Sequence, residues 1–190
     1  MNLPYIESKE FTGIDYNLEA FTKAEYDNCT FINCNFSNLD LSNYQFVECS
    51  FIDCNLSLCI LKNTGLKELH FEKCKMVGIN FNEVDPFLLQ LKFTNCQLNL
   101  ASFYKLKLKN SVFKNCSLNE TDFNETDLTN ALFNNCDFKL AIFDKTILEK
   151  ADLSSSFHYA IDPEKNNIKK AKFSKEGLAG LLEKHQLIIT

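Results

Sequence analysis

Large apolar residues recur at every fifth position along most of the chain. The first series runs from Phe11 to Phe81 without an exception. After a slip of two residues around positions 85–87, a second series runs from Leu88 to Leu153. A period of five fits neither the 3.6-residue α-helix nor the two-residue strand, so each unit must turn a corner before the next begins. The pattern predicts a backbone that coils around one continuous core.

The position two before the large residue is often small, and in the second half of the chain it is Ala, Ser or Thr at most places where it is not Cys. Side chains that alternate along extended backbone point to the same side, so we expect this residue to face inward with the large one. The other three positions, rich in Asn, Ser, Asp and Lys, are expected to face water. All nine cysteines of the chain occupy the small position: Cys29, Cys34, Cys49, Cys54, Cys59, Cys74, Cys96, Cys116 and Cys136.

A longer period of 20 residues, or 22 across the slip, is superimposed on the period of five. Four units would then form one coil, and equivalent residues would stack in columns along a four-sided rod. Twenty-nine units make about seven coils spaced by ~4.8 Å. The Phe column contains Phe11, Phe31, Phe51, Phe71, Phe93, Phe113 and Phe133. The Cys column contains Cys34, Cys54, Cys74, Cys96, Cys116 and Cys136.

The end of the chain departs from the repeat and is expected to cap the rod. Residues 1–160 are interpreted as the solenoid, and residues 161–190 as a loop, a last partial coil, a short α-helix and an apolar tail of the same domain. Ser174 can N-cap the helix. The helix and tail are expected both to cover the last core layer and to form a homodimer interface. The residues of that interface are Leu178, Leu181, Leu182, Leu187, Ile188 and Ile189.

Composition argues against several functions. The net charge is −5, with 20 lysines and no arginine, which disfavours direct nucleic-acid binding. No export signal or membrane-spanning run is present, so a cytoplasmic protein without disulfides is expected. No grouping of nucleophile, base and carboxylate and no glycine-rich phosphate loop indicates an enzyme, a cofactor or a small-molecule substrate. The stacked cysteines leave metal or redox chemistry as an alternative to small apolar packing, and packing is favoured.

The consensus of a small residue, a polar residue, Leu or Phe, and two polar residues resembles the pentapeptide-repeat family over residues 11–153. The resemblance extends to the Qnr-type quinolone-resistance proteins and the related MfpA. It implies an all-β fold, a right-handed quadrilateral β-helix. It also implies a rod that mimics duplex DNA, binds DNA gyrase or topoisomerase IV and protects it from quinolones. A C-terminal helix would join two such rods end to end.

Two features are candidates for a partner surface. Glu120, Asp122, Glu125 and Asp127 form an acidic group with no lysine between them, whereas acids and lysines largely cancel elsewhere. Phe87, in the slip, is expected to be exposed. DNA mimicry requires a dense acidic surface. The alternative is a structural or adaptor scaffold that uses the rod to bind an unrelated protein.

Overall fold

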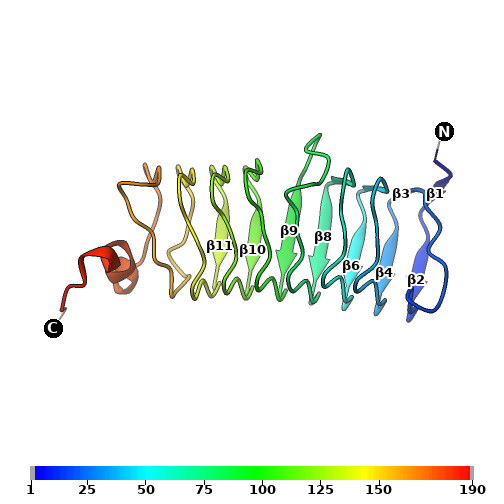
Figure 1. Cartoon of the computed structure of the whole chain (residues 1–190), viewed down its shortest axis with the longest axis horizontal. Helices are drawn as coiled ribbons and strands as arrows, with labels where there is room; N and C mark the ends of the chain where they lie inside the picture. The colour runs from blue at the N-terminus through cyan, green and yellow to red at the C-terminus, as the bar shows by residue number, and fades with distance from the viewer. Residues whose placement is uncertain (1–2, 189–190) are drawn as a thin grey trace.

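The computed structural model describes residues 3–188, which form an elongated parallel β-solenoid of about six turns (Figure 1). The coils stack along the long axis, and the two ends of the chain lie at opposite ends of the rod. The all-β solenoid is confirmed, with about six turns against the expected number of about seven. The right-handed sense of the coil stays a prediction.

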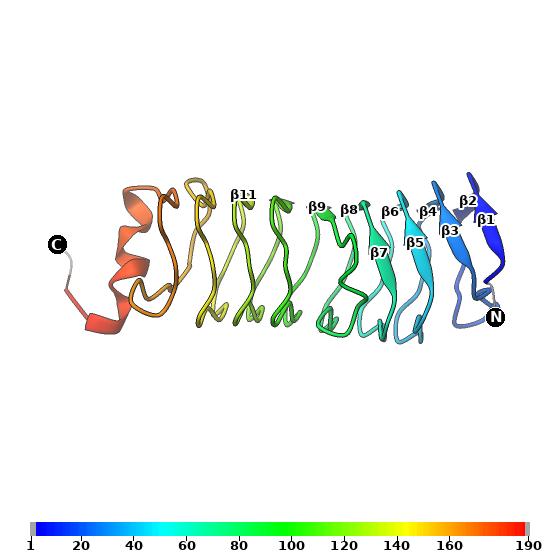
Figure 2. The same cartoon turned by 90° about the horizontal axis from the view of Figure 1, so that it is seen from above.

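Short strands on two sides of the rod form two parallel sheets. The four-stranded sheet contains β1 (Tyr5–Glu7), β3 (Glu25–Asp27), β5 (Gln45–Val47) and β7 (Gly65–Lys67). The seven-stranded sheet contains β2 (Glu10–Thr12), β4 (Thr30–Ile32), β6 (Ser50–Ile52), β8 (Leu69–Glu72), β9 (Leu91–Thr94), β10 (Val112–Lys114) and β11 (Leu132–Asn134). The first sheet faces the viewer in Figure 2.

The register of the strands confirms the predicted coil length. Neighbouring strands pair residues that are 20 apart, as in Tyr5 with Glu25. The pairing of β8 with β9 places Phe71 beside Phe93, which are 22 apart. The two extra residues of the slip therefore lengthen one coil without shifting the columns above it.

The Phe column is continuous. Successive rings stack with centroids between 4.8 and 5.3 Å apart. Every ring of the column except Phe11, in the first coil, is buried. A fully buried Phe contributes about 1.5–3 kcal/mol by burial, which is offset in part by the entropy of ordering the chain. Because each ring contacts only the coils next to it, the core is a line of neighbouring contacts.

The corners explain why polar residues fill the remaining positions. The residue two after most of the large ones has a positive φ, as in Asn115 (53°) and Asn135 (55°). Asn tolerates this left-handed conformation because its short polar side chain can hydrogen-bond locally. Here the Asn135 amide donates to the Asn115 side chain of the preceding coil at 3.0 Å. Asn at this position therefore favours both the corner and the stacking of coils.

The prediction that Leu88 lies in the core is wrong. The slip forms a bulge that projects from the side of the rod that carries β7 (Figure 1), and Leu88 in it is 65% exposed with a φ of 56°. Leu89, which is half-buried, and the buried Leu91 pack against the core instead. Pro86 has no backbone N–H, and the two extra residues leave room for the chain to leave the coil. The period of five therefore does not continue through the bulge.

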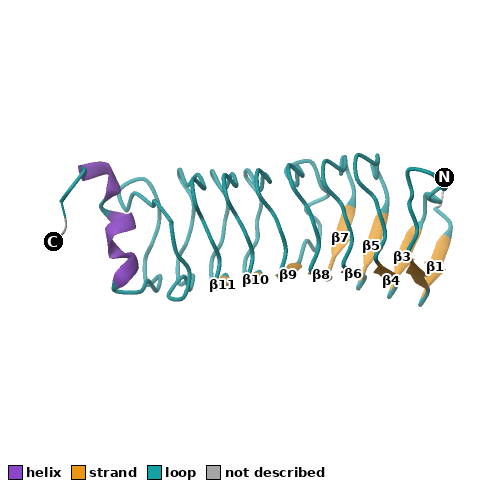
Figure 3. Cartoon of the chain, turned by 90° about the horizontal axis from the view of Figure 1, so that it is seen from below, coloured by secondary structure: helices purple, strands orange, loops and turns teal. Residues whose placement is uncertain are grey.

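The C-terminal helix is also different from the prediction. It consists of two 3₁₀ segments, η1 (Glu176–Leu181) and η2 (Glu183–His185), and not an α-helix (Figure 3). Ser174 does accept a hydrogen bond from the Gly177 N–H at 3.0 Å, as an N-cap residue would. Gly177 and Gly180 lie so close to Tyr159 that a Cβ atom on either would collide with it. Close packing on the last coil thus accompanies the 3₁₀ geometry.

Candidate protein-interaction surfaces

The small inward residues hydrogen-bond to the backbone of the preceding coil. Each cysteine thiol donates to the carbonyl oxygen 23 positions earlier, or 25 across the bulge, as Cys54 does to Phe31 at 3.3 Å. Thr and Ser at this position donate in the same way, as Thr126 does to Phe103 at 2.9 Å. The sequence indicated only that small residues are frequent at this position. The structure adds that Cys, Thr and Ser are chosen because each is small and carries a donor.

The cysteines are arranged for packing. All nine are buried and free. Burial raises the pKa of Cys49 and of Cys59 to about 12, so the thiolate that metals and oxidants require is disfavoured at neutral pH. Within residues 3–188, no three His, Cys, Asp or Glu side chains are grouped so as to hold a metal ion. Packing and hydrogen bonding therefore account for the Cys column.

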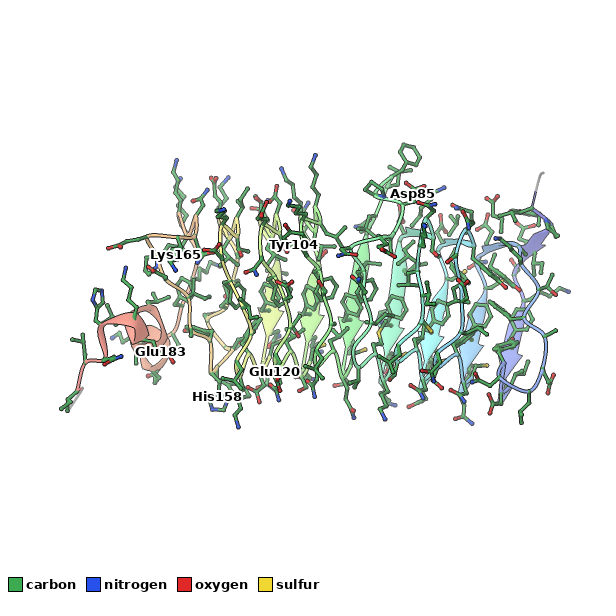
Figure 4. All side chains as sticks on the ribbon, in the orientation of Figure 1. Asp85, Tyr104, Glu120, His158, Lys165 and Glu183 are labelled. Atoms are coloured by element: carbon green, nitrogen blue, oxygen red, sulfur yellow. The ribbon has the colours of Figure 1, made fainter. Side chains whose placement is uncertain are left out.

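The structure does not bring the predicted acidic group together. Asp122 and Asp127 lie on two successive sides of one coil, and Glu120 and Glu125 lie at corners. Glu120 lies at the lower edge of the rod in Figure 4. Tyr104, whose hydroxyl lies 3.3 Å from Glu125 Oε1, lies on the upper part of the same view. A partner that contacts one flat side of the rod would meet only part of the group.

Lysines from the preceding coil neutralise half of this group. Lys105 Nζ lies 3.6 Å from Glu125, and Lys109 Nζ lies 3.2 Å from Asp127. Burial opposes ionisation of Asp127, but hydrogen bonds from Thr129 and the nearby Lys109 outweigh it and hold the pKa of Asp127 below its usual value. These lysines are 18 to 20 residues away in sequence and became neighbours only through the coil.

A different acidic region lies at the N-terminal end of the rod. Residues 1–60 contain nine carboxylates and two lysines, whereas residues 61–190 contain sixteen carboxylates and eighteen lysines. In the part of the chain that the structure describes, every salt bridge involves residues from Glu72 onward. We define the N-terminal acidic surface as Glu7, Glu25, Asp27 and Glu48, on or beside β1, β3 and β5.

Tyr5 reports the negative potential of this surface. Its hydroxyl donates a hydrogen bond to Asp27 Oδ2 at 2.7 Å. That hydrogen bond, together with slight desolvation and the charges of Asp27, Glu7 and Glu25, raises the pKa of Tyr5 to about 12. The carboxylates of this surface form no local acidic run, so the local charge pattern did not predict it. A count of charges for each third of the chain would have found it.

The bulge presents apolar side chains to solvent. Phe87 is 63% exposed, as predicted, and the Lys67 ammonium lies 5.6 Å from the centre of its ring. Phe87 and Leu88 are neighbours at the tip of a segment that projects from the rod. Adjacent exposed apolar residues of this size are typical of protein contacts.

The residues predicted for the dimer interface divide into two sets. Leu181 packs against the core of the last coil. Leu178, Leu182, Leu187 and Ile188 are exposed, so the end of the rod presents apolar side chains. Ile189 lies outside the described residues. The end-to-end dimer stays a prediction.

The repeats of this chain match a known protein family. A family model described as "Pentapeptide repeat region" matches residues 24–86 and 88–160, which is more than half of the chain. The chain belongs to the pentapeptide-repeat family. This is a non-enzymatic structural family, in keeping with the hydrogen-bonded, tightly filled core. None of the curated proteins matches the chain.

Two solved structures are similar to this chain. QnrB1, described as a plasmid-mediated fluoroquinolone resistance protein, superposes with a TM-score of 0.54 at 20% identity, covering 96% of this chain and 100% of QnrB1. HetL from Nostoc sp. strain PCC 7120, described as involved in heterocyst differentiation regulation, has a TM-score of 0.41 at 17% identity, covering 90% and 88%. At these identities the likeness to QnrB1 establishes the fold.

No helix within residues 3–188 is long and apolar enough to cross a membrane.

Proposed function

We propose that this chain is a non-enzymatic binding protein of the Qnr type, which docks on DNA gyrase or topoisomerase IV as a DNA mimic. The observation that carries the proposal is the N-terminal acidic surface on a straight, rigid rod. A surface that binds in place of DNA must present carboxylates that are not already neutralised. Glu7, Glu25 and Glu48 satisfy this requirement, whereas Glu125 and Asp127 do not.

The test is a supercoiling assay with purified gyrase, with and without ciprofloxacin, over a wide range of concentrations of the purified chain. The expected result is protection from the drug or inhibition of supercoiling. A variant with Glu7→Lys, Glu25→Lys and Glu48→Lys should need at least about ten times the concentration for the same effect, because it reverses the potential of the surface.

A matched variant separates the two acidic regions. Glu83→Lys, Glu120→Lys and Glu125→Lys make the same change in net charge at positions outside the N-terminal acidic surface. We expect this variant to act as the unaltered chain does. No effect of the unaltered chain on gyrase or on topoisomerase IV at any concentration would refute the proposal. If the second variant lost more of its effect on gyrase than the first, the residues around Glu120 would be the binding surface instead.

The second candidate function is an adaptor that holds an unrelated protein, and the exposed Phe87 and Leu88 favour it. A pull-down with the intact chain and with a Phe87→Ser, Leu88→Ser variant tests it. Recovery of a protein other than a topoisomerase, lost with the variant, would support the adaptor. A topoisomerase retained by both forms would contradict it.

A further inference from the structure

The side of the rod that carries β1, β3, β5 and β7, which we call the β1 face, changes sign along its length. Beyond the bulge this face continues through the bridges that pair Lys107, Asp127, Ile147 and Asn167 in turn. Figure 2 looks onto the β1 face, and the bulge divides it into two halves.

Charged residues on the β1 face and its two corners are distributed unequally between the halves. The half before the bulge carries six carboxylates and two lysines, and the half after it carries eight lysines and three carboxylates. The first set is Glu7, Glu25, Asp27, Glu48, Glu68, Glu83, Lys23 and Lys67. The second set is Lys105, Lys107, Lys109, Lys145, Lys150, Lys165, Lys169, Lys170, Glu125, Asp127 and Glu149.

Backbone hydrogen bonds make lysines of adjacent coils in the second half neighbours. The Lys145 N–H bonds to the Lys165 carbonyl at 3.1 Å, and the Lys150 N–H bonds to the Lys169 carbonyl at 2.9 Å. Like charges held one coil apart repel, so the arrangement favours an external anionic surface. Lys165 lies on the upper side of the rod in Figure 4, on the same side as Asp85 in the bulge.

The bulge stands at the middle of the β1 face. Leu88 comes 82 residues after Ile6, in the first coil, and 80 residues before Ile168, in the last partial coil. Its tip exposes Phe87 and Leu88 on the side from which the bulge projects. The face therefore has an acidic half, an apolar projection at its centre and a basic half.

From this order we infer that the β1 face binds a second copy of the chain, side by side and antiparallel. A two-fold axis that runs between the two rods at the level of the bulges, perpendicular to their long axes and parallel to the facing surfaces, places the acidic half of each copy opposite the basic half of the other. The same operation brings Phe87 and Leu88 of the two copies together. A parallel pair would instead set like charges against each other along the whole face.

This pairing differs from the end-to-end dimer in shape and in salt dependence. Side-by-side rods have a maximum dimension close to that of one rod, whereas rods joined by Leu182 and Leu187 would be about twice as long. Exposed charges more than about 10 Å apart are screened at 0.1 M salt, so an association that depends on them weakens as salt is added. The pairing uses the same carboxylates as the proposed topoisomerase binding, so the two compete, and a topoisomerase would bind the dissociated chain. The experiment measures the pairing alone, on the isolated protein, so either proposal can fail without the other.

The experiment is sedimentation velocity with small-angle scattering on the purified full-length chain, at 50 mM and 500 mM NaCl. The expected result is a dimer of single-rod length at 50 mM NaCl, with a dissociation constant that rises at least about ten-fold at 500 mM. One variant carries Glu7→Lys, Glu25→Lys and Glu48→Lys. The other carries three reversals in the basic half, at Lys165→Glu, Lys169→Glu and Lys170→Glu. These six side chains are exposed or half-buried and take part in none of the salt bridges described above.

Each triple variant should be monomeric alone, because both halves of its face then have a similar charge. An equimolar mixture should form a heterodimer, which also shows that both variants are folded. A Leu187→Asp, Ile188→Asp variant is the control and should dimerise as the unaltered chain does. The inference is overturned if the unaltered chain stays monomeric to about 100 µM at 50 mM NaCl, where electrostatic association is strongest. A dimer of double length, dimers of the triple variants alone, or a mixture that stays monomeric would overturn it equally.

Discussion

Replacing one ring at the centre of the Phe column tests whether the rod is stabilised by contacts between neighbouring coils. Phe113 is fully buried and stacks on Phe93 and Phe133, with centroids 5.0 and 4.8 Å away. A Phe113→Ala change removes the burial of the ring and leaves a cavity, which typically costs about 3–5 kcal/mol. The free energy of unfolding of a domain of ordinary size is about 5–15 kcal/mol, so this single change removes a large part of the stability.

The same substitution at the end of the column is the matched control. Phe11 stacks on Phe31 alone, at 5.0 Å, and is half-buried. Phe11→Ala should therefore cost about 1–2 kcal/mol, because less apolar surface is returned to water and no closed cavity forms.

Urea unfolding followed by circular dichroism measures both variants. The midpoint of Phe113→Ala should fall much further than that of Phe11→Ala, with similar dependence on urea concentration in both. Equal losses at the two positions, or a loss below about 1 kcal/mol at Phe113, would show that the column is not the main source of cohesion and would refute the reasoning.

Three further outcomes are expected. Thr126→Val, which removes the donor to Phe103 but keeps the shape, should lower the free energy of unfolding by about 1 kcal/mol, whereas Thr126→Ser should keep the hydrogen bond; equal costs would contradict the bonding role. Because the pKa of Cys59 is raised to about 12 in the folded chain, the free energy of unfolding should be unaffected by this thiol below pH ~8.5 and decline toward pH 12. For the same reason, native thiols should react slowly with a thiol reagent at pH 8. Rapid labelling of a native thiol would argue against the buried column. Gly180→Ala makes the new Cβ collide with the Tyr159 carbonyl oxygen and should release η1 from the last coil, seen as faster proteolysis there; unchanged cleavage would show that the contact is unimportant.

The repeat could be predicted in detail because it depends on contacts that recur in sequence. Phe31 and Phe51 stack because they are one coil apart, and the same spacing places Cys34 next to Cys54. The period of five and the period of 20 are therefore enough to predict the solenoid and its columns. Leu88 could not be predicted, because nothing in the pattern shows whether two extra residues stay in the coil or leave it.

The surfaces were harder to predict, because their composition depends on which residues the coil brings together. Glu125 and Asp127 look like an isolated acidic group in sequence, but Lys105 and Lys109 lie beside them one coil below. The N-terminal acidic surface, spread over three coils, shows no local acidic run at all. In a rod of this kind, a residue has its surface neighbours about 20 positions away.

The sequence by itself determined the solenoid, its columns and the inward position of every cysteine, because a strict apolar period admits only one way to bury those residues. Only the tertiary structure decided which carboxylates stay free of lysines and where the bulge projects. It also showed that the C-terminal segment is 3₁₀ and packs on Tyr159. Burial is specified by each residue and its period, whereas charge pairing and the path of an irregular segment depend on distances between coils.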